Sequence, residues 1–459
     1  MPRVKPSPLE SLLSSPRVRE AARALVEAVA AEAGERSLTH RQFEGALKEI
    51  ERKRGRPLLF PTLLSGGGQG ARVRLADGTS RLDFIGGIGI YAFGHGDPDL
   101  LETAVVAAAA DTVFQGHLAP GPEYLRLSRA LLRHAGSRLK HVWLSLSGSM
   151  SNENALKMIL QKHHPADRMV AFEHGFCGRT LALAEITDKA ANREGLPLRG
   201  AVDLVPFYDP DDPDSTRKSV EALDAHLTRH SGRIAGMLFE LVQGEGGFNT
   251  APPGFFHALM ERCHKARIAV WVDEVQTFAR TGELFAFQQL GLGAHVDLVT
   301  CGKALQGSAV LFTKRYNPKP GLVAGTYAGS TVGMAVGARI IERLEEESFL
   351  GPEGRVALLA RRFERRLEAL SKRCPHAIGP GSGIGAMQAF VVFDGSAEIT
   401  LEVLRVAHEE GLMAFMAGQD PAKIRMLLPL NTTDEELETG LTMLEKALRR
   451  VAEERGIPC

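Results

Sequence analysis

Several features that would point to particular classes of protein are scarce or missing in this 459-residue sequence. Lys plus Arg and Asp plus Glu both number 55, so no excess charge favours a nucleic acid or an anionic membrane as partner. No apolar run approaches the roughly 20 residues of a membrane span, and the N-terminus lacks a signal-peptide core. We therefore expect no nucleic-acid partner, no membrane association and a cytoplasmic protein.

Cysteine is also scarce, and its spacing excludes two further classes. The five cysteines form no CxxC pair, which argues against a disulfide framework and against a thiolate metal site. They are Cys177, Cys263, Cys301, Cys374 and Cys459. A reducing compartment suits this pattern, and we expect no metal.

The sequence contains enough hydrophobic residues to form a large core. With 44% hydrophobic and 24% charged residues, the chain reads as a globular protein of two or more domains. Residues 1–58 hold two amphipathic stretches typical of surface helices, which predicts an N-terminal helical extension. Residues 59–99 begin a small domain, with a hairpin whose turn is Asp77-Gly78.

From residue 100 to 335, short apolar strands alternate with helical patterns. This alternation predicts a large α/β domain with a mostly parallel sheet and helices on both faces. Residues 336–459 hold long helical patterns and the strand "GAMQAFVVF", which predicts a smaller α+β domain. The glycine-rich "GPGSGIG" precedes that strand, so we expect a tight turn there.

Polar residues follow several of the predicted strands. Ligands of parallel sheets collect at the carboxyl ends of the strands, so these side chains should converge on one crevice. They are Ser147, His174, Glu240, Asp273, Glu274 and Lys303.

Ser147-Gly148-Ser149 leaves a predicted strand and enters a helix. Backbone N–H groups and the helix dipole at such a point can bind a phosphate group. The same residues also suit an ordinary helix N-cap, and on this stretch alone both interpretations stay open.

Lys303 lies in "LVTCGKALQG", among small and apolar residues. Desolvation lowers the pKa of a lysine, as an amine nucleophile or a Schiff-base lysine requires. A lysine that extends from a strand end into solvent is the alternative. A Walker phosphate loop is excluded, because Ala304 follows the lysine.

The order of motifs resembles one known family. A glycine-serine turn, "GFCGRT", "QGEGG", "DEVQTFARTG" and then Gly-Lys together resemble the class III (ornithine and 4-aminobutyrate type) aminotransferases, over roughly residues 70–450. The resemblance implies the type I pyridoxal-phosphate-dependent transferase fold, with a mostly parallel seven-stranded sheet in the large domain and a smaller α+β domain. It also implies pyridoxal 5'-phosphate as cofactor.

The resemblance gives roles to individual residues. Asp273 would keep the pyridine nitrogen of the cofactor protonated, and Lys303 would form the Schiff base and then shuttle the proton. A homodimer with shared active sites is implied, because Thr326 matches a threonine that reaches the phosphate bound by the neighbouring subunit. The other cofactor-binding positions are Gly148, Ser149 and Met150 at the phosphate, Phe176 and Val275 on the two ring faces, and Gln276 at the 3-hydroxyl oxygen.

Substrate residues follow from the same resemblance. Arg179 matches an arginine that binds a substrate carboxylate. Glu245 and Arg425 match a pair in which the glutamate can mask the arginine. Such a switch predicts an ω-amino acid (ornithine, lysine or 4-aminobutyrate-like) or related amine as donor and 2-oxoglutarate as keto-acid acceptor, by a ping-pong mechanism.

The chain departs from the family pattern near this pocket, with Met150-Ser151 in place of Glu-Ala and Cys177 in place of a histidine. Two other functions remain open at this point. A racemase, epimerase or aminomutase of the same fold would use the same motif residues, and it would need no keto acid. A non-catalytic cofactor-binding scaffold would not require Asp273, Lys303 and Arg179 together.

Overall fold

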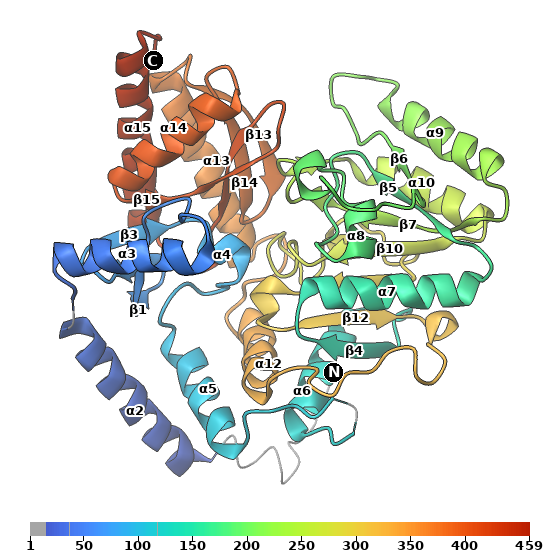
Figure 1. Ribbon diagram of the computed structural model, residues 1–459, viewed down its shortest axis with the longest axis horizontal. Coiled ribbons are helices and arrows are strands. Elements are labelled where there is room, and N and C mark those ends of the chain that lie inside the picture. The colour runs from blue at the N-terminus through green and yellow to red at the C-terminus, as the bar shows by residue number, and fades with distance from the viewer. Residues whose placement is uncertain (1–14, 36, 117) are drawn as a thin grey trace. The chain divides into compact units, whose positions relative to one another are not determined.

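A computed structural model describes residues 15–35, 37–116 and 118–459 of the chain. Its contacts divide these residues into two compact units (Figure 1). Unit 1 comprises the described residues up to Ala110, together with Leu358–Gly381 and Gln388–Cys459, and unit 2 comprises Asp111–Ala357 and Ser382–Met387. None of the described helices combines the length and hydropathy that a membrane-crossing segment needs.

Unit 2 is built on a seven-stranded sheet. In spatial order the strands are β4 (His141–Ser145), β12 (Ser308–Phe312), β11 (Leu298–Cys301), β10 (Ala269–Glu274), β7 (Ile234–Glu240), β5 (Arg168–Phe172) and β6 (Val202–Val205). Only β12 runs antiparallel to its two neighbours. The remaining pairs are parallel, which confirms the predicted fold class.

Helices cover both faces of this sheet. The helices of unit 2 that the site and its surroundings need are α6 (Pro122–His134), α7 (Gly148–His163), α9 (Ser215–Arg229), α10 (Pro253–Lys265) and α12 (Thr331–Glu346). Trp271 of β10 packs in one cluster with Ile159 of α7. Phe172 of β5 stacks on Phe255 of α10 with ring centroids 5.7 Å apart. Because strand side chains alternate between faces, this packing decides which face each strand-end residue reaches.

Unit 1 contains the predicted hairpin. Strands β2 (Arg72–Leu75) and β3 (Ser80–Asp83) pair antiparallel around the Asp77-Gly78 turn. Gly78 adopts a φ of 87°, which glycine reaches without the steric cost that a side chain would add. The hairpin belongs to a sheet with the order β1 (Leu64–Gln69), β2, β3 and β15 (Leu412–Met413).

A second four-stranded sheet has the order β13 (Ile378–Ile384), β14 (Met387–Val392), β17 (Lys423–Leu427) and β16 (Phe415–Ala417). The prediction of a tight turn over "GPGSGIG" was wrong, because most of this stretch forms strand β13. Glycine weakens a strand when no partner is near, and here hydrogen bonds to β14 override that preference.

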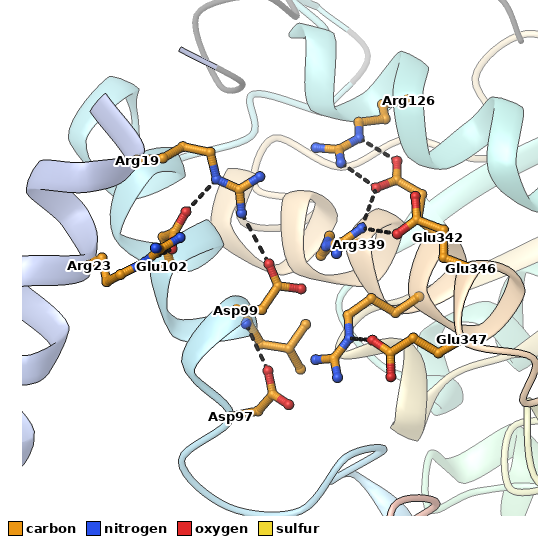
Figure 2. A network of polar contacts seen from close by, with 12 residues as sticks. Arg19, Arg23, Asp97, Asp99, Glu102, Arg126, Arg339, Glu342, Glu346 and Glu347 are labelled. Carbon is orange, nitrogen blue, oxygen red and sulfur yellow. Dashed lines mark hydrogen bonds and ion pairs between the residues drawn. The ribbon is translucent and has the colours of Figure 1, made fainter. Parts of the chain in front are cut away.

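The two predicted N-terminal helices are present as α2 (Pro16–Glu35) and α3 (His40–Arg54), while residues 1–14 lie outside the described part. Arg23 of α2 forms a 3.1 Å ion pair with Glu102 of α5 (Pro98–Ala110), and Arg19 pairs with the same carboxylate (Figure 2). Arg19 also reaches Asp99 at 3.0 Å. These contacts fasten α2 to α5 within unit 1.

The remaining described helices of unit 1 are the short α4 (Gly86–Gly89), α13 (Arg355–Arg373), which begins at the end of unit 2, α14 (Ala397–Glu409) and α15 (Asp434–Arg455). Helix α12 lies in unit 2, although the sequence pattern predicts its residues from 336 onward for the C-terminal small domain. Arg126 of α6 binds Glu342 of α12 through two hydrogen bonds of 2.8 and 2.5 Å (Figure 2). The names and limits of the predicted domains stay a prediction.

Candidate active site

The end of β10 presents two adjacent carboxyl groups to opposite faces of the sheet. Asp273 follows Trp271 on the α7 face, and Asn152 of α7 donates a 2.7 Å hydrogen bond to its Oδ2. Glu274 lies on the other face, where its Oε1 accepts a hydrogen bond from the Phe287 N–H at 2.9 Å. Only Asp273 therefore faces the N-terminal end of α7.

Asp273 is buried, with 8% of its surface exposed. Burial raises the pKa of its carboxyl group to about 6. Hydrogen bonds from the Val275 N–H, at 2.9 Å, and from Asn152 oppose this rise, as does the positive charge of Lys303. The carboxylate is therefore mostly ionised at neutral pH, and a further cation beside it would hold it so.

Glu240 lies next to Asp273 on the neighbouring strand β7. Its Oε2 accepts a hydrogen bond from the Phe176 N–H at 2.6 Å, and its Oε1 accepts one from the Gly244 N–H at 3.1 Å. Burial, followed by the charge of Asp273, raises the pKa of Glu240 to about 8. Glu240 therefore joins the loop of Phe176 to the loop of Gly244.

Val275 brings three segments together just beyond β10. A Cβ atom at Gly148 would lie 2.7 Å from Val275 Cγ1, so only glycine allows the first turn of α7 to approach so closely. A Cβ atom at Gly302 would lie 3.4 Å from the same methyl group. Lys303 follows with a φ of 48°, a conformation that is uncommon for a long side chain and often marks a functional position.

The N-terminus of the 16-residue helix α7 opens beside these residues. Ser147 is the N-cap, and its hydroxyl accepts a 3.3 Å hydrogen bond from the Met150 N–H. A Cβ atom at Gly178 would approach Ser149 Oγ to 2.9 Å, which places the loop after β5 against this turn. The geometry combines an N-cap with a helix N-terminus suited to an anion.

The loop after β5 carries an aromatic ring and a cation. The guanidinium of Arg179 lies 5.5 Å from the centre of the Phe176 ring. Arg179 also donates a 3.0 Å hydrogen bond to Asn192 Oδ1, and its side chain is exposed. Asn152 Nδ2 donates a second hydrogen bond, at 2.6 Å, to the Cys177 carbonyl oxygen. The same amide thus connects this loop to Asp273.

Two buried amide oxygens near Asp273 lack a hydrogen-bond partner within the described part of the chain. They are Asn152 Oδ1 and Gln276 Oε1. A Cβ atom at Gly244 would lie 2.5 Å from Gln276 Nε2, so Gln276 lies against the "QGEGG" loop. Buried polar atoms are nearly always satisfied, and a bound polar group is the expected partner for such a pair.

The family model "Aminotransferase class-III" matches residues 61–448. The chain belongs to the class III aminotransferases. It is a pyridoxal-phosphate-dependent aminotransferase, with an amine donor and a keto acid as its substrates.

This aminotransferase is similar to curated proteins over most of its length. It is 33% identical to the 2-aminoadipate transaminase of Pseudomonas putida over 417 residues, which cover 85% of this chain and 96% of that one. It is 30% identical to the mitochondrial acetylornithine aminotransferase of Eremothecium gossypii, covering 85% and 92% of the two chains. It is 31% identical to the 5-aminovalerate aminotransferase of P. putida, covering 82% and 91%.

Solved structures share the fold of the aminotransferase. The lysine aminotransferase from M. tuberculosis superposes with a TM-score of 0.79 at 22% identity, covering 88% of this chain and 99% of that one. The ornithine aminotransferase from Toxoplasma gondii gives a TM-score of 0.75 at 25% identity, covering 86% and 91%.

The residues of the aminotransferase site fit pyridoxal phosphate. The α7 N-terminus suits its phosphate group, and the ionised, buried Asp273 suits a protonated ring nitrogen. Gln276 Oε1 is one of the two buried oxygens that a polar ring substituent could satisfy. The α7 N-terminus, Asp273 and Gln276 are therefore each of the chemical kind that the corresponding part of the cofactor would bind.

Three further residues were predicted to take part in the site. Thr326 is exposed on the loop between η3 (Lys314–Tyr316) and α12. Arg425 belongs to unit 1, where it is 1% exposed and its guanidinium lies 5.5 Å from the Phe415 ring centre. Glu245 lies in unit 2 and raises the pKa of Glu240. The roles of these three residues stay predictions.

The hydrogen bonds of Asn152 to Asp273 and to the Cys177 carbonyl oxygen were not predicted from the sequence. Glu240 was predicted only as a strand-end residue. Asn152 lies four residues after Gly148, so it lies one helical turn below the glycine-serine turn and on the same side of α7. This spacing is the signal that would have pointed to it. The strand-end position of Glu240 was predictable from the sequence pattern, whereas only the strand register identifies Asp273 as its neighbour.

Proposed function

We propose that this aminotransferase moves the amino group of an ω-amino acid to 2-oxoglutarate by a ping-pong mechanism. The observation that carries the proposal is the position of the Arg179 guanidinium, 5.5 Å from the Phe176 ring, on the loop that Asn152 joins to Asp273. An arginine there can bind a substrate carboxylate through two parallel hydrogen bonds. The names of the relatives, which include 5-aminovalerate and 2-aminoadipate, support an amino acid donor.

Pyridoxal phosphate, when bound, supplies an aldehyde that condenses with amines and a ring that withdraws electrons from the carbon bearing the amine. In our proposal the Asp273 carboxylate holds a proton on the ring nitrogen. The Lys303 amine would accept the proton released at the substrate carbon and donate it back within the same half-reaction. Phe176 and Val275 confine the ring, and the N–H groups of Gly148, Ser149 and Met150 bind the phosphate.

For the acceptor, we propose that Arg425 binds the second carboxylate of 2-oxoglutarate and that Glu245 masks this arginine while the donor is bound. We also propose a cytoplasmic homodimer in which Thr326 serves the partner's phosphate site. Exposed apolar side chains in unit 2 support a second copy that covers this region: Leu118 is 84%, Tyr327 53%, Leu146 51% and Met150 42% exposed.

The test is the absorption spectrum of the purified enzyme during each half-reaction. We expect an ω-amino acid, added without a keto acid, to bleach the visible band of the bound cofactor. 2-Oxoglutarate should then restore the band. A band that shifts with substrate but never converts would indicate an isomerase and contradict the proposal. A protein that shows no band after addition of pyridoxal phosphate would contradict the assigned cofactor site.

The roles of the two arginines can be separated by measuring the half-reactions individually. Arg425→Ala should slow the return of the band with 2-oxoglutarate far more than its bleaching by the donor. Arg179→Gln should weaken both half-reactions through KM. Arg193→Gln, which removes an arginine paired with Asp188 on the following segment, is the matched control. A normal acceptor half-reaction in Arg425→Ala would show that the assignment of Arg425 is wrong.

A further inference from the structure

Helices α13 and α15 of unit 1 run side by side in the same direction. Arg362 pairs with Asp434 at 2.9 Å, and Arg373 pairs with Glu445 at 2.7 Å, both across 72 residues of sequence. The ion pair of Arg366 with Glu438 has the same offset. A constant offset means that the two helices are parallel, and it places the end of α13 at Arg373 beside Glu445, within the last three turns of α15.

A cysteine follows each of these helix ends. Cys374 comes directly after Arg373, the last residue of α13. Helix α15 stops at Gly456, whose φ of 64° forms a left-handed C-cap, and the Ile457 N–H then donates back to the Ala452 carbonyl. This bond turns the residues that follow back along α15 toward the end of α13, where the Cys459 thiol lies near enough to raise the pKa of Cys374.

The two thiols differ in access. Cys374 is fully buried, whereas Cys459 is only half-buried. Burial and the neighbouring thiol raise the pKa of Cys374 to about 12. Arg449 opposes this rise and Glu445 adds to it. A small oxidant in solution therefore meets Cys459 first, and Cys374 reacts only with a group already held at Cys459.

We propose that Cys374 and Cys459 are a modification site that closes to an intramolecular disulfide when the protein meets a small organic disulfide such as oxidised glutathione. The Cys459 thiolate attacks one sulfur of the oxidant, forms a mixed disulfide and releases one glutathione thiolate. Cys374 then loses its proton and attacks the Cys459 sulfur, which releases the second glutathione. The two protein thiols give up two protons and two electrons, and these leave as two molecules of reduced glutathione.

The cysteine spacing predicted no structural disulfide framework. A single disulfide that forms and breaks reversibly is not such a framework. Eighty-five residues separate the two cysteines (459 minus 374), so their spacing carries no sign of a pair. Closing a loop of this length restricts the unfolded chain, and it ties the segment after α15 to the end of α13. The consequence for the protein is a more stable C-terminal helix in the oxidised form.

The experiment titrates the full-length holoenzyme with mixtures of oxidised and reduced glutathione, followed by acid quenching, alkylation and peptide mass spectrometry. We expect one cross-linked peptide pair that contains Cys374 and Cys459. The oxidised protein should have a thermal midpoint higher by on the order of 5 °C, which reduction reverses. Cys177, Cys263 and Cys301, which are buried, should be alkylated only after denaturation.

Matched variants distinguish closure from other oxidation. Cys459→Ser and Cys374→Ser should each abolish the cross-link and the rise in midpoint, while Cys263→Ser should keep both. Cys459 that carries glutathione without any cross-linked peptide would overturn the proposal, because Cys374 would then be out of reach. A disulfide between two copies of Cys459, seen as a covalent dimer on a non-reducing gel, would overturn it too.

Discussion

Carboxyl groups occupy opposite surroundings in the two units of the chain. At the strand ends of unit 2, burial raises the pKa values of Asp273, Glu274 and Glu240 to about 6, 7 and 8. On α15 of unit 1, hydrogen bonds from Arg373 and Arg449 lower the pKa of Glu445. The first arrangement lowers the stability of the ionised protein and leaves the carboxyl groups ready to receive a cation. The second orients two helices at the surface and contributes little energy.

Replacing Asp273 should give the largest effect in this comparison. We expect Asp273→Asn to lower kcat by roughly 10³-fold, because an amide cannot hold the proton on the cofactor ring nitrogen. Glu274→Gln is the matched control on the opposite face of the strand, and the folded variant should keep kcat within a few-fold. Steady-state kinetics and a melting curve measure both variants. Equal losses of kcat in the two variants would show that Asp273 and Glu274, on opposite faces of β10, do not differ in their importance for catalysis.

Asn152 should have the next largest effect. Asn152→Ala removes a hydrogen bond that favours the ionised form of Asp273, so the pKa of Asp273 should rise further. We expect kcat/KM to fall about 10- to 100-fold, and to fall more at pH 6 than at pH 9, because the acid limb moves to higher pH. Asn154→Ala on the same helix is the control. A uniform loss at every pH would indicate a structural role only.

The effect of Glu240 should be visible in stability without any substrate. Its pKa is raised from 4.5 unfolded to about 8 folded, so the cofactor-free protein holds an extra proton between these values. The free energy of unfolding should therefore fall as pH rises from about 4.5 to about 8, by at most about 5 kcal/mol. Urea titrations of the cofactor-free protein should show a flatter profile for Glu240→Gln.

Glu445→Gln provides a contrast to Glu240→Gln, because the folded protein lowers the pKa of Glu445 and raises that of Glu240. The folded pKa of Glu445 lies below 4.5, so its contribution is complete above the unfolded value and is lost only as pH falls below about 4.5. The profile of Glu445→Gln between pH 5 and 8 should run parallel to that of the wild type. A parallel profile for Glu240→Gln as well would show that Glu240 is not protonated in the folded protein.

The ion pairs between α13 and α15 should give the smallest effect. We expect Arg366→Ala to shift the thermal midpoint by less than about 2 °C, because both partners are partly exposed and solvent screens them. The shift should shrink further in 1 M salt. A drop of 10 °C would show that the pairs stabilise unit 1 as strongly as its buried core.

The sequence predicted the sheet and the positions of its chemistry because both depend on local patterns. Runs such as "IAVWVDEVQ" marked strands buried on both faces, and polar residues marked their ends. The resemblance then assigned roles to Asp273 and Lys303. The contact of Val275 with Gly148 and Gly302 was beyond reach, because it depends on the distance between segments far apart in the chain.

Other predictions were incomplete or wrong, because they rested on the local preferences of residues alone. The glycines of β13 predicted a turn, and only pairing with β14 makes them a strand. Glu240 showed a strand end, and the register that puts it beside Asp273 is set by the sheet as a whole. The ion pairs of α13 could not be read from the sequence, because their partners come 72 residues later.

The ion pairs of α2 with α5 have a practical consequence for anyone who trims the gene to obtain a shorter, more easily crystallised protein. Starting the chain after residue 35 would take the guanidinium groups of Arg19 and Arg23 away from Glu102, whose side chain is only 4% exposed while α2 is in place. A carboxylate that loses its counter-charges destabilises the fold to the extent that other residues keep it buried. A trimmed version should therefore also carry Glu102→Gln, and the comparison of its yield with that of the simple truncation would tell whether the N-terminal helix can be dispensed with.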